Sequence, residues 1–288
     1  RIVTNIATFT QRDGYVEFQP EGQPVYMPQI SNLVLGVAPG VIDTGANPVG
    51  VITNTGEGGA YDRSQLPYFS IVGAATTNNG VAMTNAMDVT FNRGMFRSYS
   101  RGVLGYEMSN ATKAVYSGTF TLNGAAEESI FNIHHETWSS ASYNGTSAVR
   151  QTVFEGPFTG SGGFSKIGSG EMLFTGSNDF TGAVNISRGF DSGRGRWGGI
   201  GLRENGAFSG VSQVTLNRDG SLYLDNSAVN LSNRLNDAAP IITRGRNQIE
   251  LMANGSAPSY ERFGAVTTAQ GSMAFEFDKV DGSFQQQT

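Results

Sequence analysis

Short stretches in which apolar and polar residues alternate recur along the second half of the chain. In each stretch two apolar residues stand two positions apart, and Gly, Asn or Asp residues separate one stretch from the next. The pairs are Met172/Phe174, Val184/Ile186, Val214/Leu216, Leu222/Leu224, Val229/Leu231, Ile249/Leu251 and Phe275/Phe277. Alternation over so few residues is typical of half-buried strands. The pattern predicts a series of short β-strands joined by turns.

The segment from Gly160 to Gly189 shows this pattern most clearly. The side chains that we expect to be buried there are Met172, Phe174, Phe180, Val184 and Ile186. We expect Leu173 and Asn185 to face outward. The glycines that we expect in turns, several of them with positive φ, are Gly168, Gly170, Gly176 and Gly182.

A repeated glycine pattern of this kind favours the coils of a β-solenoid. Evenly spaced short strands could also form a β-sandwich or barrel, which is the alternative fold. The opening of the chain is less regular, because six of the nine prolines lie in the first 67 residues and proline is excluded from inner strands. We therefore expect two parts: an irregular β region at 1–155 that continues the solenoid, and a regular β-solenoid at 156–288.

The composition supports an all-β, exported chain. Glycine accounts for 39 of 288 residues, and charged residues make up only 15%, against about 25% in typical domains. Cysteine is absent, which excludes disulfides and thiolate metal sites and suits an exported protein. The net charge of −5 argues against nucleic acid as a partner. No apolar run is long enough for a membrane-spanning helix. Because the first residue is Arg1, we expect a processed chain or part of a longer protein.

The segment 160–189 resembles the passenger-associated repeat of bacterial autotransporters and related giant surface proteins, whose units follow GxGGLxKxGxGxLxLxGxNxYTGxxxVxxG. The matching residues are Gly162, Gly163, Phe164, Lys166, Gly168, Gly170, Met172, Phe174, Gly176, Asn178, Phe180, Thr181, Gly182, Ile186 and Gly189. Residues 230–240 are similar to the segment LxxRLxDxAPxxL of these proteins, and residues 259–271 to SExxGxLTLxxG. The resemblance is good over about 155–280 and fainter over 1–150. Residues 189–199 depart from it, because they are richer in Arg and Trp.

The resemblance implies a right-handed parallel β-helix with an irregular, Pro-rich N-terminal portion. It also implies an extracellular protein of the bacterial cell surface that acts as a structural or adhesive stalk or fibre. Its partners would be neighbouring repeats or further copies of the chain at the solenoid ends, and a surface glycan or a host or matrix ligand. The first alternative function is a self-assembling extracellular filament or coat subunit. The second is a glycan-active β-helix enzyme.

Candidate chemistry is sparse. His134 and His135 are adjacent and would face opposite ways on a strand, so we do not expect them to hold one metal ion. The acidic residues are scattered rather than grouped at coil spacing. We therefore expect no enzyme activity, no catalytic residue, no metal and no cofactor. A basic, aromatic segment is the candidate loop for an acidic ligand or partner, although a solvated glycine-rich loop is its simpler interpretation. Its residues are Arg188, Arg194, Arg196, Trp197 and Arg203.

Overall fold

The computed structural model is an all-β structure. It describes residues 6–11, 15–18, 30–36, 67–72, 83–100, 114–135, 151–168, 170–187 and 199–279. These residues form β-strands and turns, contain no helix, and pair only in parallel. The expected all-β class is confirmed. A β-sandwich is built from antiparallel strands, and antiparallel pairs do not occur among the described strands.

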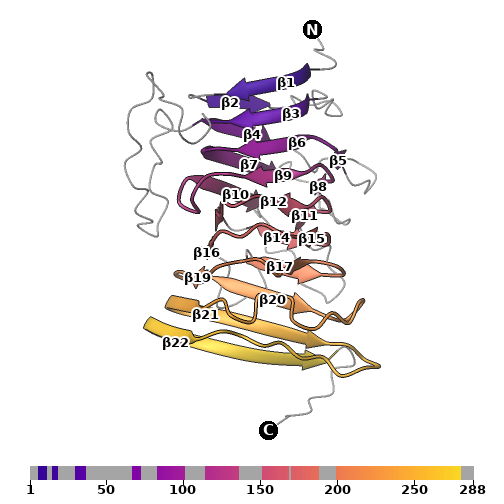
Figure 1. The fold of residues 1–288 in the computed structure, drawn as a ribbon, viewed down its shortest axis with the longest axis vertical. Coiled ribbons are helices and arrows are strands. Elements are labelled where there is room, and N and C mark those ends of the chain that lie inside the picture. The colour runs from indigo at the N-terminus through magenta and orange to yellow at the C-terminus, as the bar shows by residue number, and fades with distance from the viewer. Residues whose placement is uncertain are drawn as a thin grey trace, which may run out of the picture.

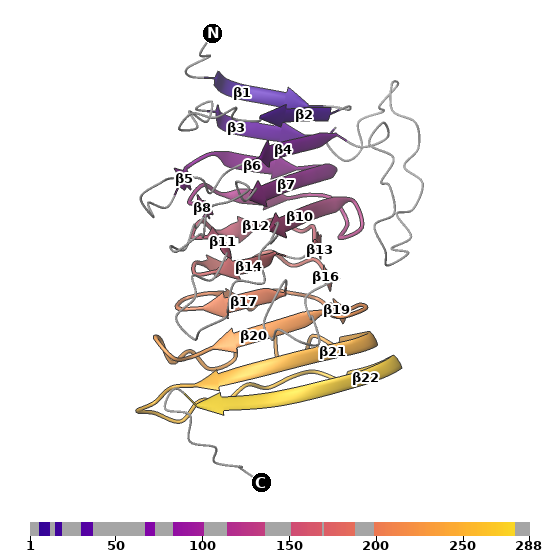
Figure 2. The ribbon, with the colours of Figure 1, turned by 180° about the vertical axis from the view of Figure 1, so that it is seen from behind.

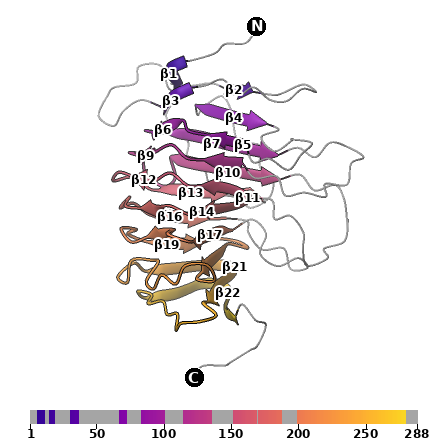
Figure 3. The same ribbon diagram turned by 90° about the vertical axis from the view of Figure 1, so that its right-hand side faces the viewer.

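Three ladders of strands run along the molecule, and we name them the first, second and third faces (Figures 1 and 3). The first face contains β1 (Ile6–Gln11), β3 (Ile30–Leu35), β6 (Asp88–Phe91), β9 (Phe120–Leu122) and β12 (Phe158–Thr159). The second contains β2 (Tyr15–Phe18), β4 (Tyr68–Val72), β7 (Gly94–Ser100), β10 (Ser129–His135), β13 (Phe164–Ile167), β16 (Val184–Ile186) and β19 (Val214–Leu216). The third contains β5 (Met83–Asn85), β8 (Ala114–Tyr116), β11 (Gln151–Phe154), β14 (Glu171–Phe174), β17 (Ile200–Arg203) and β20 (Ser221–Asp225).

Two long strands close the C-terminal end of the stack. β21 (Ile241–Ala253) pairs with β19 through its first residues and with β20 through its last ones, so it joins the second and third faces in one 15-stranded sheet. β22 (Val266–Lys279) pairs with β21 along its length. The short strands β15 (Ser177–Asn178) and β18 (Ala207–Phe208) pair with each other, and Phe208 forms a further parallel bridge to Leu235.

From β3 to β20, most strands pair with the third strand further along the chain, as β4 does with β7 and β7 with β10. We call each set of one strand per face a rung. This connectivity is compatible with a β-helix, because each rung lies on the one before it (Figure 2). β11 and β14 pair across residue 155, while the division of the chain at that residue stays a prediction.

Like side chains stack on like side chains inside the rungs. On the third face, one inward column contains Tyr116, Phe154, Phe174, Leu202, Leu224 and Leu251, all of them buried. Its aromatic rings are nearly parallel: the ring centroids of Tyr116 and Phe154 are 5.3 Å apart, and those of Phe154 and Phe174 are 5.4 Å apart. The five side chains expected to be buried between Met172 and Ile186 are fully buried. The register predicted for this segment is therefore confirmed.

Two expectations need refinement. Leu173 faces outward as expected, but it is only 5% exposed, because it packs with Val115 and Val153 in a small cluster outside the main core. The parallel register places these three residues in one outer column. Asn185, by contrast, is half-buried and bonds to Ser165 on the neighbouring strand, as an outward polar residue should. The second difference concerns the pair Val229/Leu231, which was expected in a strand. It lies outside any strand, and Val229 is exposed.

The four expected turn glycines all lie outside strands. Gly168 has a φ of 86°, which glycine adopts without strain. Gly176 and Gly182 do not have the positive φ that we expected of several of these glycines. They are needed for another reason, because a Cβ at Gly182 would collide with the carbonyl of Gly162 on the preceding rung. Close stacking of the turns, rather than unusual backbone angles, requires glycine there.

Asn178 connects three successive rungs. Its side chain is buried; its Oδ1 accepts a hydrogen bond from the N–H of Phe158, and its Nδ2 donates to the carbonyl of Ala207. A second bond from Nδ2 to the carbonyl of Gly176 closes the local turn. The buried amide thus satisfies backbone groups above and below it, as buried polar groups must.

Candidate functional site

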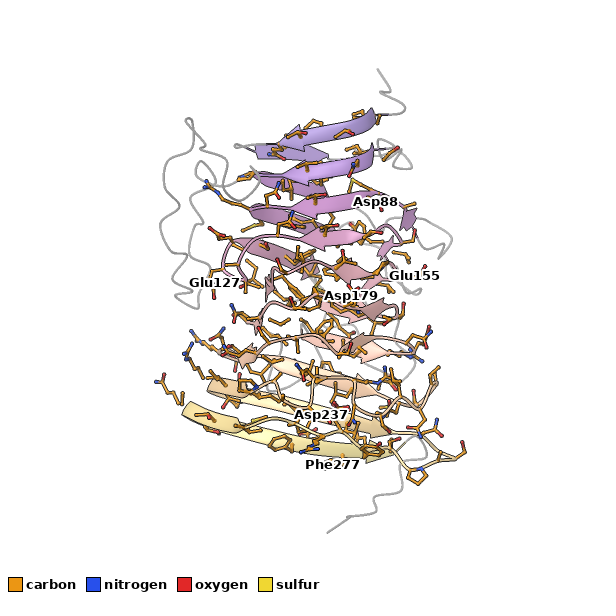
Figure 4. All side chains as sticks on the ribbon, viewed as in Figure 1. Asp88, Glu127, Glu155, Asp179, Asp237 and Phe277 are labelled. Atoms are coloured by element: carbon orange, nitrogen blue, oxygen red, sulfur yellow. The ribbon has the colours of Figure 1, made fainter. Side chains whose placement is uncertain are left out.

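The acidic side chains of the described residues are dispersed over the stack. Figure 4 labels Asp88, Glu127, Glu155, Asp179 and Asp237, which are spread over the stack, with Glu127 and Glu155 at a similar height on opposite sides. Within the described ranges no group of three or more His, Asp or Glu side chains is placed to hold a metal ion. His134 and His135 end β10, and their side chains fall outside the described part of the chain.

The candidate loop is described at only one of its residues. Arg188, Arg194, Arg196 and Trp197 lie outside the described residues. Arg203 is at the far end of β17, about 10 Å along the strand from Ile200. Its Nε lies 3.5 Å from Oδ2 of Asp225, its register partner on the next rung. The structure therefore assigns Arg203 to an ion pair between rungs, and a ligand role for the loop stays a prediction.

The most distinctive surface is the C-terminal rung, which consists of β22 and the preceding segment 260–265. Of the large apolar side chains that are exposed among the described residues, all except Val229 belong to this rung. They are Tyr260 (61% exposed), Val266 (41%), Phe275 (45%) and Phe277 (63%). Phe263 and Met273 are partly buried beside them, and the ring centroids of Phe263 and Phe275 are 6.0 Å apart. Figure 4 shows Phe277 on the outermost strand of the stack.

Three of these exposed residues, Val266, Phe275 and Phe277, are the last described members of internal columns. Val266 follows Val214 and Ile241 on the second face. On the third face, Phe275 follows Leu222 and Ile249, and Phe277 follows Leu224 and Leu251. Every earlier member of these columns whose side chain is described is buried, because another rung covers it. Among the described residues, the C-terminal rung is therefore an open cross-section of the core.

The uncovered area is energetically significant. A buried aromatic side chain typically removes about 150–250 Å² from water. At about 25 cal/mol per Å² of apolar surface, covering the exposed parts of Phe275 and Phe277 would contribute about 5 kcal/mol. The strand edge adds to this, because β22 has 14 residues and β21 is its only neighbour among the described strands. A long unpaired edge without proline is a template for further strand pairing.

The carboxylate of Glu261 links the start of the C-terminal rung to the preceding rung through hydrogen bonds. Oε2 of Glu261 accepts a hydrogen bond of 2.8 Å from the N–H of Arg234, and Oε1 accepts one of 2.9 Å from the N–H of Leu235. Burial raises the pKa of Glu261, although both hydrogen bonds and the charge of Arg234 oppose the increase. Segment 260–265 is thereby held against the segment that contains Leu235.

Arg234 joins the last rungs from inside the structure. Its side chain is fully buried, and all five of its N–H donors form hydrogen bonds. Nε donates to Oδ1 of Asn226, while the two terminal nitrogens donate to four backbone carbonyls. These carbonyls belong to Glu204, Gly206, Asp225 and Val229. Burial lowers the pKa of Arg234, and the charges of Asp225 and Glu261 oppose this shift.

A second buried cation lies further up the stack. Lys166 is fully buried between Phe131 and Ile186 in a column of the second face. Its Nζ donates to the carbonyl of Gly168 at 2.7 Å. Burial lowers the pKa of Lys166 well below its ordinary value, and the nearby charge of Glu171 opposes the decrease. An amine at a position that holds apolar residues on both neighbouring rungs carries a desolvation cost.

The sequence did not predict a role for Arg234, Glu261 or Lys166. The segments that contain Arg234 and Glu261 were both identified by their resemblance to repeat proteins. The contact between these two residues was not predicted, because they are 27 positions apart in the sequence. An isolated arginine in a turn segment of a chain with few charges was the available signal.

No described helix is long and apolar enough to cross a membrane. Comparison with protein-family models, with curated proteins and with solved structures gives no match to this chain.

Proposed function

We propose that the chain is a right-handed parallel β-helix and serves as a structural segment, a stalk or fibre, of an exported protein of the bacterial cell surface. The observation that carries the proposal is the continuous series of parallel strand pairs along the second face, from β2 to β19, which β21 and β22 extend. Such a ladder suits a stiff spacer, since each rung is hydrogen-bonded to the next and apolar columns run through its centre.

Further support comes from the side chains that hydrogen-bond one rung to the next. Asn178 bonds to the rungs on both sides of it, and Arg234 bonds to backbone carbonyls of two earlier turns. In a repeat structure the total stability depends on contacts between neighbouring units. Buried polar side chains that hydrogen-bond neighbouring rungs together therefore favour a mechanical role. The resemblance of 160–189 to the passenger-associated repeat supports the location at the cell surface.

A self-assembling filament or coat subunit is the second candidate function. It is favoured by one observation, the open C-terminal rung with Val266, Phe275 and Phe277 exposed. In this case the chain would itself be the repeating unit of the fibre.

Two measurements test the structural proposal. Antibodies raised against the purified chain should label intact cells of the producing organism as strongly as permeabilised cells, with a cytosolic protein as the control. Small-angle scattering of the chain under monomeric conditions should fit a particle that contains a stack of nine parallel strands, from β2 to β22, about 40 Å long. Labelling that requires permeabilisation would refute the surface location, and a scattering profile that does not fit this stack would refute the spacer.

A further inference from the structure

The N-terminal rung also has free strand edges. β1 and β2 each stand at the end of their ladders and have one neighbour among the described strands. Ile6, Phe9 and Val16 are only partly buried there, and they pack against the core from its N-terminal side. The stack therefore has partly exposed apolar residues at both ends, with β1 and β22 farthest apart (Figures 1 and 2).

The two end rungs continue the same column. On the second face, the inward column begins at Val16 and ends at Thr268. Its members in order are Val16, Phe69, Phe96, Phe131, Lys166, Ile186, Leu216, Thr243 and Thr268. A second molecule displaced along the stack would place its Val16 beyond Thr268 with the strands still parallel. β22 finishes on the third face and β1 lies on the first, so the order of the faces would also continue.

We propose that the C-terminal rung binds the N-terminal rung of a second copy of this chain, head to tail, with β22 and β2 paired in parallel. This inference rests on the proposed stacked architecture and names its partner. The contact covers Val266, Phe275 and Phe277 of one copy with the rung that carries Ile6, Phe9 and Val16 of the other. It repeats the pairing that already joins β21 to β22 within the chain.

A two-fold contact between two C-terminal rungs fits the same residues less well. It would pair β22 with β22 in antiparallel fashion, whereas every described pairing is parallel. With Phe275 of each copy opposite Phe277 of the other, it would place the two Glu276 carboxylates opposite each other, which is unfavourable for like charges on paired strands. It would also leave Ile6, Phe9 and Val16 uncovered. A head-to-tail contact covers both ends and, because it does not close on itself, produces fibres.

The test compares variants of the full chain by sedimentation velocity over a range of concentrations. The C-end variant carries Phe275→Lys with Phe277→Lys, and the N-end variant carries Ile6→Lys. The matched control is Val229→Lys, because Val229 is an exposed apolar residue outside both end rungs. Circular dichroism and thermal melting first establish that each variant keeps the wild-type fold. Should Ile6→Lys fail to fold, Ala7→Lys on the same exposed strand replaces it.

The wild type and the control should form assemblies larger than dimers as the protein concentration rises. Each end variant should remain monomeric at concentrations about 100-fold above those at which the wild type associates. An equimolar mixture of the C-end and N-end variants should form dimers only, since one intact end of each kind remains. A wild type that stays monomeric would overturn the proposal, and so would association that stops at a dimer and survives the N-end variant. A monomer whose scattering fits the stack and that is labelled at the cell surface would leave the structural function standing while this inference fails.

Discussion

Replacing Arg234 tests whether the buried guanidinium holds the C-terminal rungs together. Arg234→Leu removes five hydrogen bonds, and two of their acceptors, Oδ1 of Asn226 and the carbonyl of Gly206, take part in bonds that are buried. A buried acceptor left without a partner costs about 1–3 kcal/mol. We therefore expect a loss of about 3–5 kcal/mol in the free energy of unfolding, after allowing for partial access of water to the other three acceptors.

The more informative variant is Arg234→Lys, which keeps the charge. Lysine has three donors on a flexible stem and cannot reproduce the planar fork of five donors. We expect it to lose about 2 kcal/mol, since at least two of the five hydrogen bonds disappear. The matched control is Arg203→Lys, because Arg203 is 39% exposed at its side chain and forms one ion pair between rungs. Surface pairs of this kind contribute about 0–1 kcal/mol.

The assay is urea denaturation combined with hydrogen exchange of the amides near Phe208 and Leu235, which lie in the affected rungs. Hydrogen exchange is needed because a stack of repeats can unfold in parts. Stability and protection of Arg234→Lys within about 0.5 kcal/mol of the wild type would refute the role assigned to Arg234.

Three further predictions concern the core and its titrating groups. Phe174→Asp should unfold the neighbouring rungs and lower the melting temperature, because it places an unpaired charge in a buried column; an unchanged melting temperature would contradict the register. Lys166→Met should stabilise the protein at neutral pH. Because the folded-state pKa of Lys166 lies below its ordinary value of 10.5, the wild type regains stability as pH rises towards 10.5, so the advantage of the variant in chemical denaturation should shrink over that window. The pKa of Glu261 is raised instead, so its carboxyl favours the folded state most at low pH and that contribution is lost as pH rises through the folded-state pKa. Glu261→Gln should therefore gain stability relative to the wild type between pH 4 and pH 7; a constant difference across this range would contradict the assignment.

The positions of the strands around Met172 and Ile186 were predictable, because alternation of apolar and polar residues defines which side chains share a face. The same pattern could not distinguish a covered column from an uncovered one. Phe275 and Phe277 alternate as Val184 and Ile186 do, but none of the described rungs covers them. Leu173 shows the converse limit, since parity identified its outer face but not the column that it shares with Val153.

The polar contacts that link the rungs could not be predicted from the sequence for a different reason. The partners of Arg234 come from the turns around Glu204, Asp225 and Val229 and from the segment of Glu261, and their proximity depends on the length of each rung. Rung length varies, since Phe164 pairs with Val184, 20 residues later, whereas Val184 pairs with Val214, 30 residues later. No fixed period in the sequence therefore brings these residues into register.

The parallel register of the rungs is the central claim, and engineered disulfides test it most directly in a chain without cysteine. Ser165 and Asn185 are register partners on adjacent rungs, and Thr215 follows on the next rung. Adjacent strands lie about 4.8 Å apart, within the Cα separation that a disulfide needs, whereas two rungs span about 9.6 Å and exceed it. Under mild oxidation, mass spectrometry should find a complete disulfide in the double variant Ser165→Cys, Asn185→Cys and none in Ser165→Cys, Thr215→Cys. Failure of the first pair to close, or closure of the second in its place, would contradict the stacked parallel rungs.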